Sequence, residues 1–86
     1  MLIYVKTPNC SVCQADLPRV EKIVEKLDVP SYLIDATEVP EAVGQFQLFT
    51  SPVVLLYYQG REFHRQARII DFEELTYRIE QIQENT

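Results

Sequence analysis

An uninterrupted apolar segment, residues 53–58 (Val-Val-Leu-Leu-Tyr-Tyr), constrains the fold more than any other feature of the chain. Pro52 precedes it and Gly60 follows it, and both residue types break regular structure, so the segment is predicted as a short strand. A strand without alternating polar residues needs cover on both faces, as in a sheet packed between two layers of helices. The segment is also far shorter than the roughly 20 residues that a membrane-spanning helix requires.

Other segments also have the character of strands. Residues 2–5 (Leu-Ile-Tyr-Val) form an apolar run that ends before the breaker cluster Thr7-Pro8-Asn9. Residues 31–35, with three apolar residues at their centre, indicate a second strand. The dipeptide Gln59-Gly60 predicts a turn into a polar strand at residues 62–66, whose charges suit a sheet edge.

Helical periodicity occurs between these strands and at the end of the chain. Residues 11–27 place apolar side chains at helical spacing opposite charged ones, and Pro18 inside this segment predicts a kink. Thr37 is expected to cap a short helix that ends near Phe46. Asp71, followed three residues later by a glutamate, has the pattern of a capping box and begins the last predicted helix.

The order strand, helix, strand, helix, strand, strand, helix predicts an α/β protein with a four-stranded mixed sheet and helices on both faces. The first crossover makes the first two strands parallel and its connection right-handed. With 86 residues, the whole chain (1–86) is expected to form a single domain. The first strand then lies centrally. Its carboxyl end, where open sheets place their sites, meets the loop that carries both cysteines.

Composition excludes several classes of partner. Thirteen acidic against eight basic residues give a net charge of −5, the wrong sign for a surface that binds nucleic acid or an anionic membrane. Lys6 and Pro8 stop the first apolar run, so no secretory signal is recognised and a cytoplasmic location is expected. Two cysteines, Cys10 and Cys13, are too few and too close for a small fold held by several disulfides.

The segment Cys10-Ser11-Val12-Cys13 is the main candidate for chemistry. Cys10 stands at the start of the predicted helix, where unpaired backbone donors and the helix dipole favour a thiolate over a thiol. A thiolate attacks disulfides, and Cys13, one helical turn away, is close enough to release the product from the mixed disulfide. Lys6 either adds a positive charge beside this pair or is simply solvated.

Other interpretations of the cysteine pair stay open. The pair can be half of a zinc site, although four ligands are usual and His64 is the one other soft ligand in the chain. It can also be a structural disulfide, although so short a loop restricts the unfolded chain little. In the alternative function, the protein is an interaction module whose pair is a redox sensor or a partial zinc site. His64 itself is expected to be solvated on the edge strand, with no role.

Four features follow one another in a fixed order: the Cys-Ser-Val-Cys motif after the first strand, Pro18 five residues beyond Cys13, the Ser51-Pro52 pair before the apolar strand, and the turn at Gly60. In this order and spacing they resemble the thioredoxin-like superfamily over nearly the whole chain. Residues 3–10 are similar to glutaredoxins, whereas residues 40–59 are similar to thioredoxins. The resemblance implies the three-layer thioredoxin-like fold.

The resemblance also implies roles for single residues. Cys10 is the nucleophile, Cys13 is the resolving thiol and Pro52 is a cis-proline beside them. A cis bond would turn the backbone of Ser51 toward Cys10, where it offers a donor and an acceptor to an extended substrate. The implied activity is that of a dithiol-disulfide oxidoreductase that reduces protein disulfides. The implied partners are client proteins with disulfides and a reductase that recycles the pair. No metal and no cofactor beyond the redox-active disulfide is expected, and the protein is expected to be a monomer.

The chain departs from the family pattern at the site itself. Tyr4 occupies the place of the buried acid that assists proton transfer in thioredoxins. The Gly-Gly pair and the acidic residues that hold glutathione in glutaredoxins are absent, and residues 66–70 (Gln-Ala-Arg-Ile-Ile) stand there instead. We therefore expect glutathione to be a poor direct reductant.

Arg68 stands where thioredoxins usually carry a glycine, beside Pro52. Together with Lys6 it predicts a positive spot near Cys10, which would favour clients with acidic residues next to their disulfide. The alternative is that Arg68 reaches solvent or pairs with Glu62 or Asp71.

Overall fold

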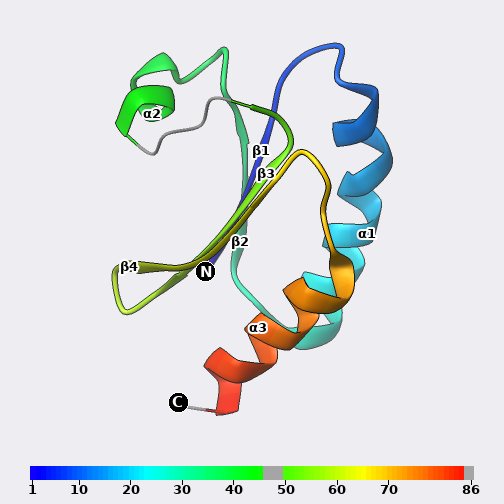
Figure 1. Cartoon of the computed structure of the whole chain (residues 1–86), viewed down its shortest axis with the longest axis vertical. Coiled ribbons are helices and arrows are strands. Elements are labelled where there is room, and N and C mark those ends of the chain that lie inside the picture. Colours follow the sequence, from blue (N-terminus) through cyan, green and yellow to red (C-terminus); the bar gives the residue numbers. More distant parts are fainter. Residues whose placement is uncertain (46–49, 85–86) are drawn as a thin grey trace.

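The computed structural model describes residues 1–45 and 50–84. In this part of the chain the elements follow the predicted order (Figure 1). They are β1 (Leu2–Lys6), α1 (Ser11–Leu27), β2 (Ser31–Asp35), α2 (Pro40–Gln45), β3 (Val53–Tyr58), β4 (Arg61–Ala67) and α3 (Phe72–Glu84). The bounds of α1, β2 and β3 agree with the sequence pattern, and β4 is one residue longer at each end than predicted.

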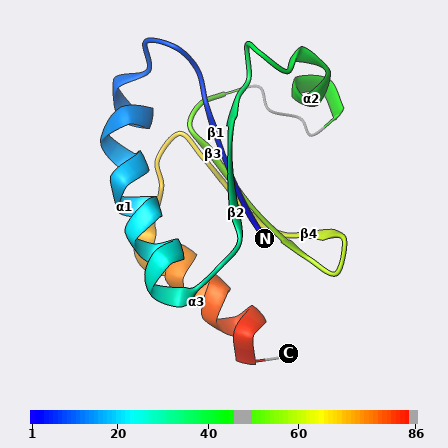
Figure 2. The ribbon, with the colours of Figure 1, turned by 180° about the vertical axis from the view of Figure 1, so that it is seen from behind.

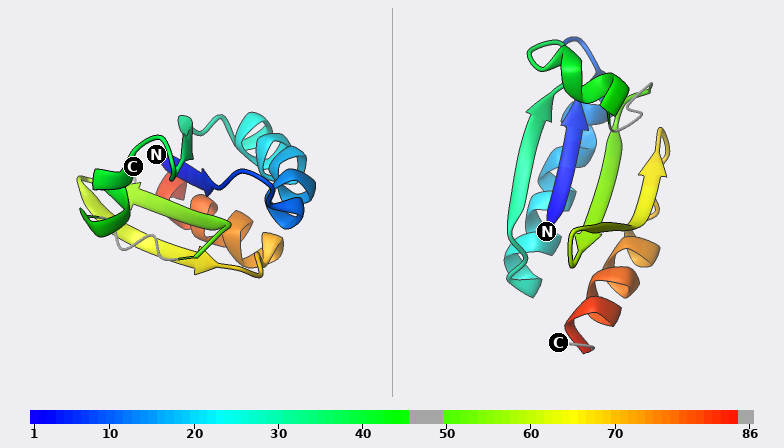
Figure 3. Two further views of the ribbon diagram at one scale, coloured as in Figure 1. Left: turned by 90° about the horizontal axis from the view of Figure 1, so that it is seen from above. Right: turned by 90° about the vertical axis from the view of Figure 1, so that its left-hand side faces the viewer.

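The strands form one sheet in the order β2-β1-β3-β4 (Figure 3). β1 runs parallel to β2 and antiparallel to β3, and β3 runs antiparallel to β4. The predicted mixed sheet with a central first strand is therefore confirmed. Because β1 and β3 are antiparallel neighbours, the loop after β1 and the loop before β3 lie at the same end of the sheet.

Helices cover both faces of the sheet: α1 and α3 pack on one face and α2 lies over the other (Figures 1 and 2). Alternate residues of β1 contribute to the two cores. Leu2 and Tyr4 pack with residues of α1 and α3, whereas Ile3 and Val5 pack with Ala42 of α2. β3 divides its apolar residues between the two cores in the same way. This two-sided burial explains why neither strand shows polar alternation.

Both ends of α1 are capped. Cys10 is the N-cap, in the extended backbone region, and its side chain accepts a backbone N–H of the first turn. Asp28 ends the helix in the left-handed conformation, with φ 55°. The Arg19 guanidinium lies 3.9 Å from the centre of the Phe72 ring, which joins α1 to α3. Pro18 lies inside α1, and the kink expected there stays a prediction.

The start of α2 differs from the prediction. The helix begins at Pro40, not after Thr37. The Asp35 carboxylate accepts the Thr37 N–H at 2.9 Å and the Thr37 hydroxyl at 2.6 Å, so Thr37 belongs to the turn that leaves β2. Pro40 takes the first helical position, where its fixed φ and missing N–H are tolerated. Phe46, the predicted end of this helix, lies outside the described residues.

The predicted start of α3 is confirmed. The Asp71 carboxylate accepts the backbone N–H of Glu74 at 3.0 Å.

Neither α3 nor any other helix in residues 1–45 and 50–84 has the length and apolar character needed to cross a membrane.

Candidate active site

The cysteine pair lies between the carboxyl end of β1 and the first turn of α1. Cys10 and Cys13 form a disulfide, with their Cα atoms 5.2 Å apart. Cys13 is 2 % exposed, whereas Cys10 is only half-buried. A sulfur atom that approaches from solvent therefore meets Cys10 and not Cys13.

The surroundings of the Cys10 sulfur favour negative charge. The Cys13 N–H donates to Cys10 Sγ at 3.1 Å, and the Ser51 hydroxyl donates to the same atom at 3.8 Å. Cys10 is also the N-cap of α1, so its sulfur lies at the positive end of the helix dipole. A backbone N–H, a side-chain hydroxyl and the positive end of the helix dipole thus converge on the Cys10 sulfur.

Ser51 and Pro52 lie beside Cys10 at the start of β3. The Ser51–Pro52 peptide bond is cis, as the resemblance implied, and Pro52 is buried. The Ser51 hydroxyl also lies 2.9 Å from the Thr7 hydroxyl. In the sequence, Thr7 stands out only as part of a breaker cluster. The one sequence feature that indicates a role at the site is its position just after the central strand, where open sheets of this kind place their functional sites.

Arg68 contacts the site through its backbone. Its N–H donates to the Pro52 carbonyl at 2.9 Å, and its φ is 69°, in the left-handed region. The Arg68 side chain is exposed and makes no ion pair with a described carboxylate. Glu62 instead pairs with Arg65 at 2.8 Å, so the pairing of Arg68 with Glu62 or Asp71 is wrong for the described part of the chain.

The structure places Lys6 beside a carboxylate on the neighbouring strand. Lys6 is the last residue of β1 and the register partner of Asp35 in β2. Hydrogen bonds from the Thr37 hydroxyl and backbone lower the pKa of the Asp35 carboxyl, and Lys6 lowers it further. The Lys6 charge therefore interacts with the Asp35 carboxylate. Among residues 1–45 and 50–84, Lys6 makes no hydrogen bond or ion pair with Cys10.

Tyr4 lies under the cysteine pair, at the place where the resemblance puts a buried acid. Its side chain is 2 % exposed, and its hydroxyl donates to the Cys13 carbonyl at 2.8 Å. Burial, together with the nearby Asp16 charge, raises the pKa of Tyr4 to about 12. The phenol thus stays protonated at neutral pH. Its hydrogen bond ties the first turn of α1 to β1.

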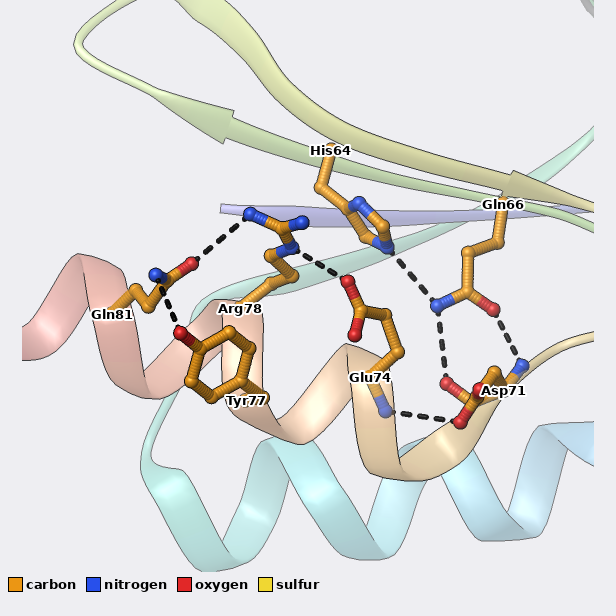
Figure 4. A network of polar contacts seen from close by, with 7 residues as sticks. All are labelled: His64, Gln66, Asp71, Glu74, Tyr77, Arg78 and Gln81. Carbon is orange, nitrogen blue, oxygen red and sulfur yellow. Dashed lines mark hydrogen bonds and ion pairs between the residues drawn. The ribbon is translucent and has the colours of Figure 1, made fainter.

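His64 is less exposed than predicted, although it is not fully buried. It is half-buried on β4, facing α3, where its Nε2 lies 3.0 Å from the side-chain nitrogen of Gln66 (Figure 4). The Gln66 amide binds both the N–H and the carbonyl of Asp71, so its nitrogen can only donate to His64. Burial lowers the pKa of His64, and the Arg78 charge lowers it further against the opposing effect of Glu74.

Residues able to hold a metal ion do not gather at the cysteines. Within the described ranges, no group of three or more histidine, cysteine or carboxylate side chains is found. The groups that contact one another at the candidate site are the two cysteines, the Thr7 and Ser51 hydroxyls, Pro52 and the backbone of Arg68.

Comparison with known proteins points to one family. No model of a known protein family matches the chain. The thioredoxin-like protein YdfQ of Bacillus subtilis (strain 168) is 37 % identical over 81 residues, which are 93 % of this chain and 72 % of YdfQ. The SPbeta prophage-derived thioredoxin-like protein YosR of the same strain is 31 % identical over 67 residues, which are 77 % of this chain and 79 % of YosR.

Solved structures of thioredoxins and thioredoxin-like proteins have the same fold as this chain. Thioredoxin 1 from Thermosipho africanus TCF52B superimposes with a TM-score of 0.88 at 33 % identity, over 98 % of this chain and 94 % of that protein. The thioredoxin-like protein from Bacillus cereus ATCC 10987 gives a TM-score of 0.72 at 32 % identity, over 93 % of this chain and 84 % of its own. With the redox-active Cys10–Cys13 disulfide at the end of its central strand, the chain belongs to the thioredoxin-like family.

Proposed function

We propose that this protein is a dithiol-disulfide oxidoreductase that reduces disulfides in client proteins. The observation that carries the proposal is the asymmetry of the cysteine pair. Cys10, at the start of α1, is half-buried and its sulfur accepts two hydrogen bonds, whereas Cys13 is buried. An exposed sulfur with stabilised charge suits attack, and a covered sulfur one turn away suits release.

The proposed reaction transfers two electrons from the cysteine pair to the client. The Cys10 thiolate attacks one sulfur of the client disulfide, a Cys10–client bond forms, and the other client sulfur leaves as a thiolate that takes a proton from solvent. Cys13 then loses its proton and attacks Cys10 Sγ. The Cys10–Cys13 disulfide forms and the second client thiol leaves. A separate dithiol reductase returns the pair to its reduced form.

Proton transfer from Cys13 has no buried acid or base to assist it in this proposal. No polar or charged side chain is buried among the described residues, apart from the Tyr4 phenol. Because the pKa of Tyr4 is raised to about 12, it does not act as a base near neutral pH. The Cys13 proton therefore leaves to solvent or to the departing client thiolate, which makes the resolving step the slower one as the pH falls.

The proposed client surface surrounds Cys10. Ser51 and Pro52 form one side of it, and Arg68 with its neighbour Ile69 forms another. Ile69 is 88 % exposed, an unusual position for a large apolar side chain, and Arg68 is exposed without an ion pair to a described carboxylate. Such a surface favours an extended client with an apolar and an acidic residue beside its disulfide. Lys6 contributes a second cation to this surface, and the neighbouring Asp35 carboxylate partly offsets its charge.

We propose that residues 1–86 form one domain that carries this activity without a metal. The reaction consumes thiol reductant, so a reducing compartment such as the cytoplasm suits it.

Turnover of a peptide disulfide in the presence of excess dithiol tests the proposal. We expect multiple turnovers with the parent protein and none above background with Cys10→Ser. The chain has no third cysteine, so no other thiol can replace the missing one. Equal rates for the parent and Cys10→Ser would contradict the proposal. If the purified protein instead binds zinc in proportion to its cysteine content and gives no turnover, the interaction-module alternative is correct.

A further inference from the structure

Two hydroxyl groups form a short chain directed at the Cys10 sulfur. The Thr7 and Ser51 oxygens lie 2.9 Å apart, and Ser51 Oγ lies 3.8 Å from Cys10 Sγ. Thr7 follows β1 and Ser51 precedes β3, and both are half-buried. The last register pair of these strands is Val5 with Val53, so Thr7 and Ser51 lie two residues beyond it on either strand. The central ladder of the sheet thus holds the two hydroxyls side by side.

The direction of the chain follows from the number of protons. A serine hydroxyl has one proton and two lone pairs. In the contact with Cys10 the Ser51 hydroxyl is the donor, so its oxygen is left to accept the proton of Thr7. Thr7 therefore donates to Ser51, and Ser51 donates to the sulfur. The hydrogen bond from Thr7 also polarises the Ser51 hydroxyl, which strengthens the hydrogen bond from Ser51 to the Cys10 sulfur.

We propose that Ser51 is a direct hydrogen-bond donor to the reduced Cys10 sulfur and that Thr7 is the residue that positions it. The inference rests on the proposed function, because it takes Cys10 as the attacking sulfur. A thiolate is a stronger acceptor than a disulfide sulfur, so the hydroxyl chain stabilises the reduced protein more than the oxidised one. The Cys13 N–H in α1 also donates to Cys10, and the hydroxyl chain adds a second donor from the segment before β3.

The pair has a simpler alternative role, which is to join the ends of β1 and β3. In that role, loss of either hydroxyl lowers the stability of the fold and leaves the reactivity of Cys10 unchanged. The two roles therefore differ in a quantity that needs no client protein, namely the pH at which reduced Cys10 becomes reactive.

The experiment measures the rate at which reduced Cys10 is alkylated, as a function of pH, in folded protein. The variants are Ser51→Ala, Thr7→Val, Thr7→Ser and the double variant Ser51→Ala/Thr7→Val. Thr76→Val is the matched control, because Thr76 is also half-buried and its hydroxyl donates to the Phe72 carbonyl within α3.

We expect Ser51→Ala to raise the pH midpoint of alkylation by about one unit. We expect Thr7→Val to raise it by about 0.3 of a unit. Thr7→Ser keeps the hydroxyl and should restore the parent midpoint, and Thr76→Val should not move it. Because Thr7 acts through Ser51, the double variant should match Ser51→Ala alone.

Two results would overturn the inference. One is a midpoint in Ser51→Ala equal to that of Thr76→Val, which would leave the hydroxyls with a structural role only. The other is a Thr7→Val effect that persists undiminished in the Ser51→Ala background, since Thr7 would then act without Ser51. If the parent protein does not turn over a client disulfide but the variants shift the alkylation midpoint as expected, only the proposed function is contradicted. If the parent turns over the client and the variants leave the midpoint unchanged, only this inference is contradicted.

Discussion

Replacement of Arg68 by glycine and by alanine separates the backbone strain at this position from the charge of its side chain. Arg68 has a φ of 69°, which a residue with a β-carbon adopts at a cost of roughly 1 to 2 kcal/mol. Glycine removes that cost but loses about 0.4 to 1 kcal/mol through the greater freedom of the unfolded chain. The net expectation is that Arg68→Gly is more stable than Arg68→Ala by about 0.5 to 1 kcal/mol.

Thermal and urea denaturation of the oxidised proteins measure this difference. For a domain of this size, we expect the melting temperature of Arg68→Gly to exceed that of Arg68→Ala by roughly 2 to 8 °C. The slope of the urea transition should be the same in both variants, because the Arg68 N–H bond to the Pro52 carbonyl is kept in each. Both variants lack the charge, so both should lose preference for acidic peptide disulfides to the same extent. An alanine variant as stable as the glycine variant would refute the strain argument.

Three further expectations concern Tyr4, His64 and glutathione. Tyr4→Phe removes the hydrogen bond to the Cys13 carbonyl and should lower the free energy of unfolding by about 1 kcal/mol in urea denaturation, whereas Tyr32→Phe, whose side chain is 57 % exposed, should leave it unchanged. Because the pKa of His64 is lowered in the folded state, the unfolded chain binds more protons below about pH 6.5, so stability should be full above that pH and fall as the pH decreases through it. Urea titrations at several pH values check this, and the same loss in His64→Gln would contradict it. Glutathione should reduce the Cys10–Cys13 disulfide slowly compared with a dithiol, as measured by stopped-flow mixing, because residues 66–70 lack the Gly-Gly backbone that binds it in glutaredoxins. A saturable, micromolar response to glutathione would contradict that expectation.

The elements buried on both faces could be predicted from sequence alone. β3 is apolar throughout, because alternate residues face α2 on one side and α1 with α3 on the other, and its bounds followed from Pro52 and Gly60. The cysteine pair could also be predicted, since the N-cap of α1 is a local property of the chain. The asymmetry between half-buried Cys10 and buried Cys13 follows from the same helix turn.

Features that depend on competing or long-range contacts could not be predicted. The Asp35 side chain takes the hydrogen bonds of Thr37, so α2 begins at Pro40 instead. His64 lies on an edge strand, but α3 covers that strand on one face, which the sequence does not indicate. Thr7 and Ser51 are 44 residues apart, and only the register of β1 with β3 brings their hydroxyls together.

The mass of the complex formed by Cys13→Ser with a peptide disulfide tests the central claim most directly. The reduced variant is mixed with the peptide, the products are quenched with acid, and proteolysis with mass spectrometry locates the linkage. The proposal predicts a covalent adduct at Cys10 that carries half of the peptide disulfide, accumulates because Cys13 is absent, and disappears on addition of dithiol. Absence of the adduct, or full multiple turnover by Cys13→Ser, would contradict attack by Cys10 and resolution by Cys13.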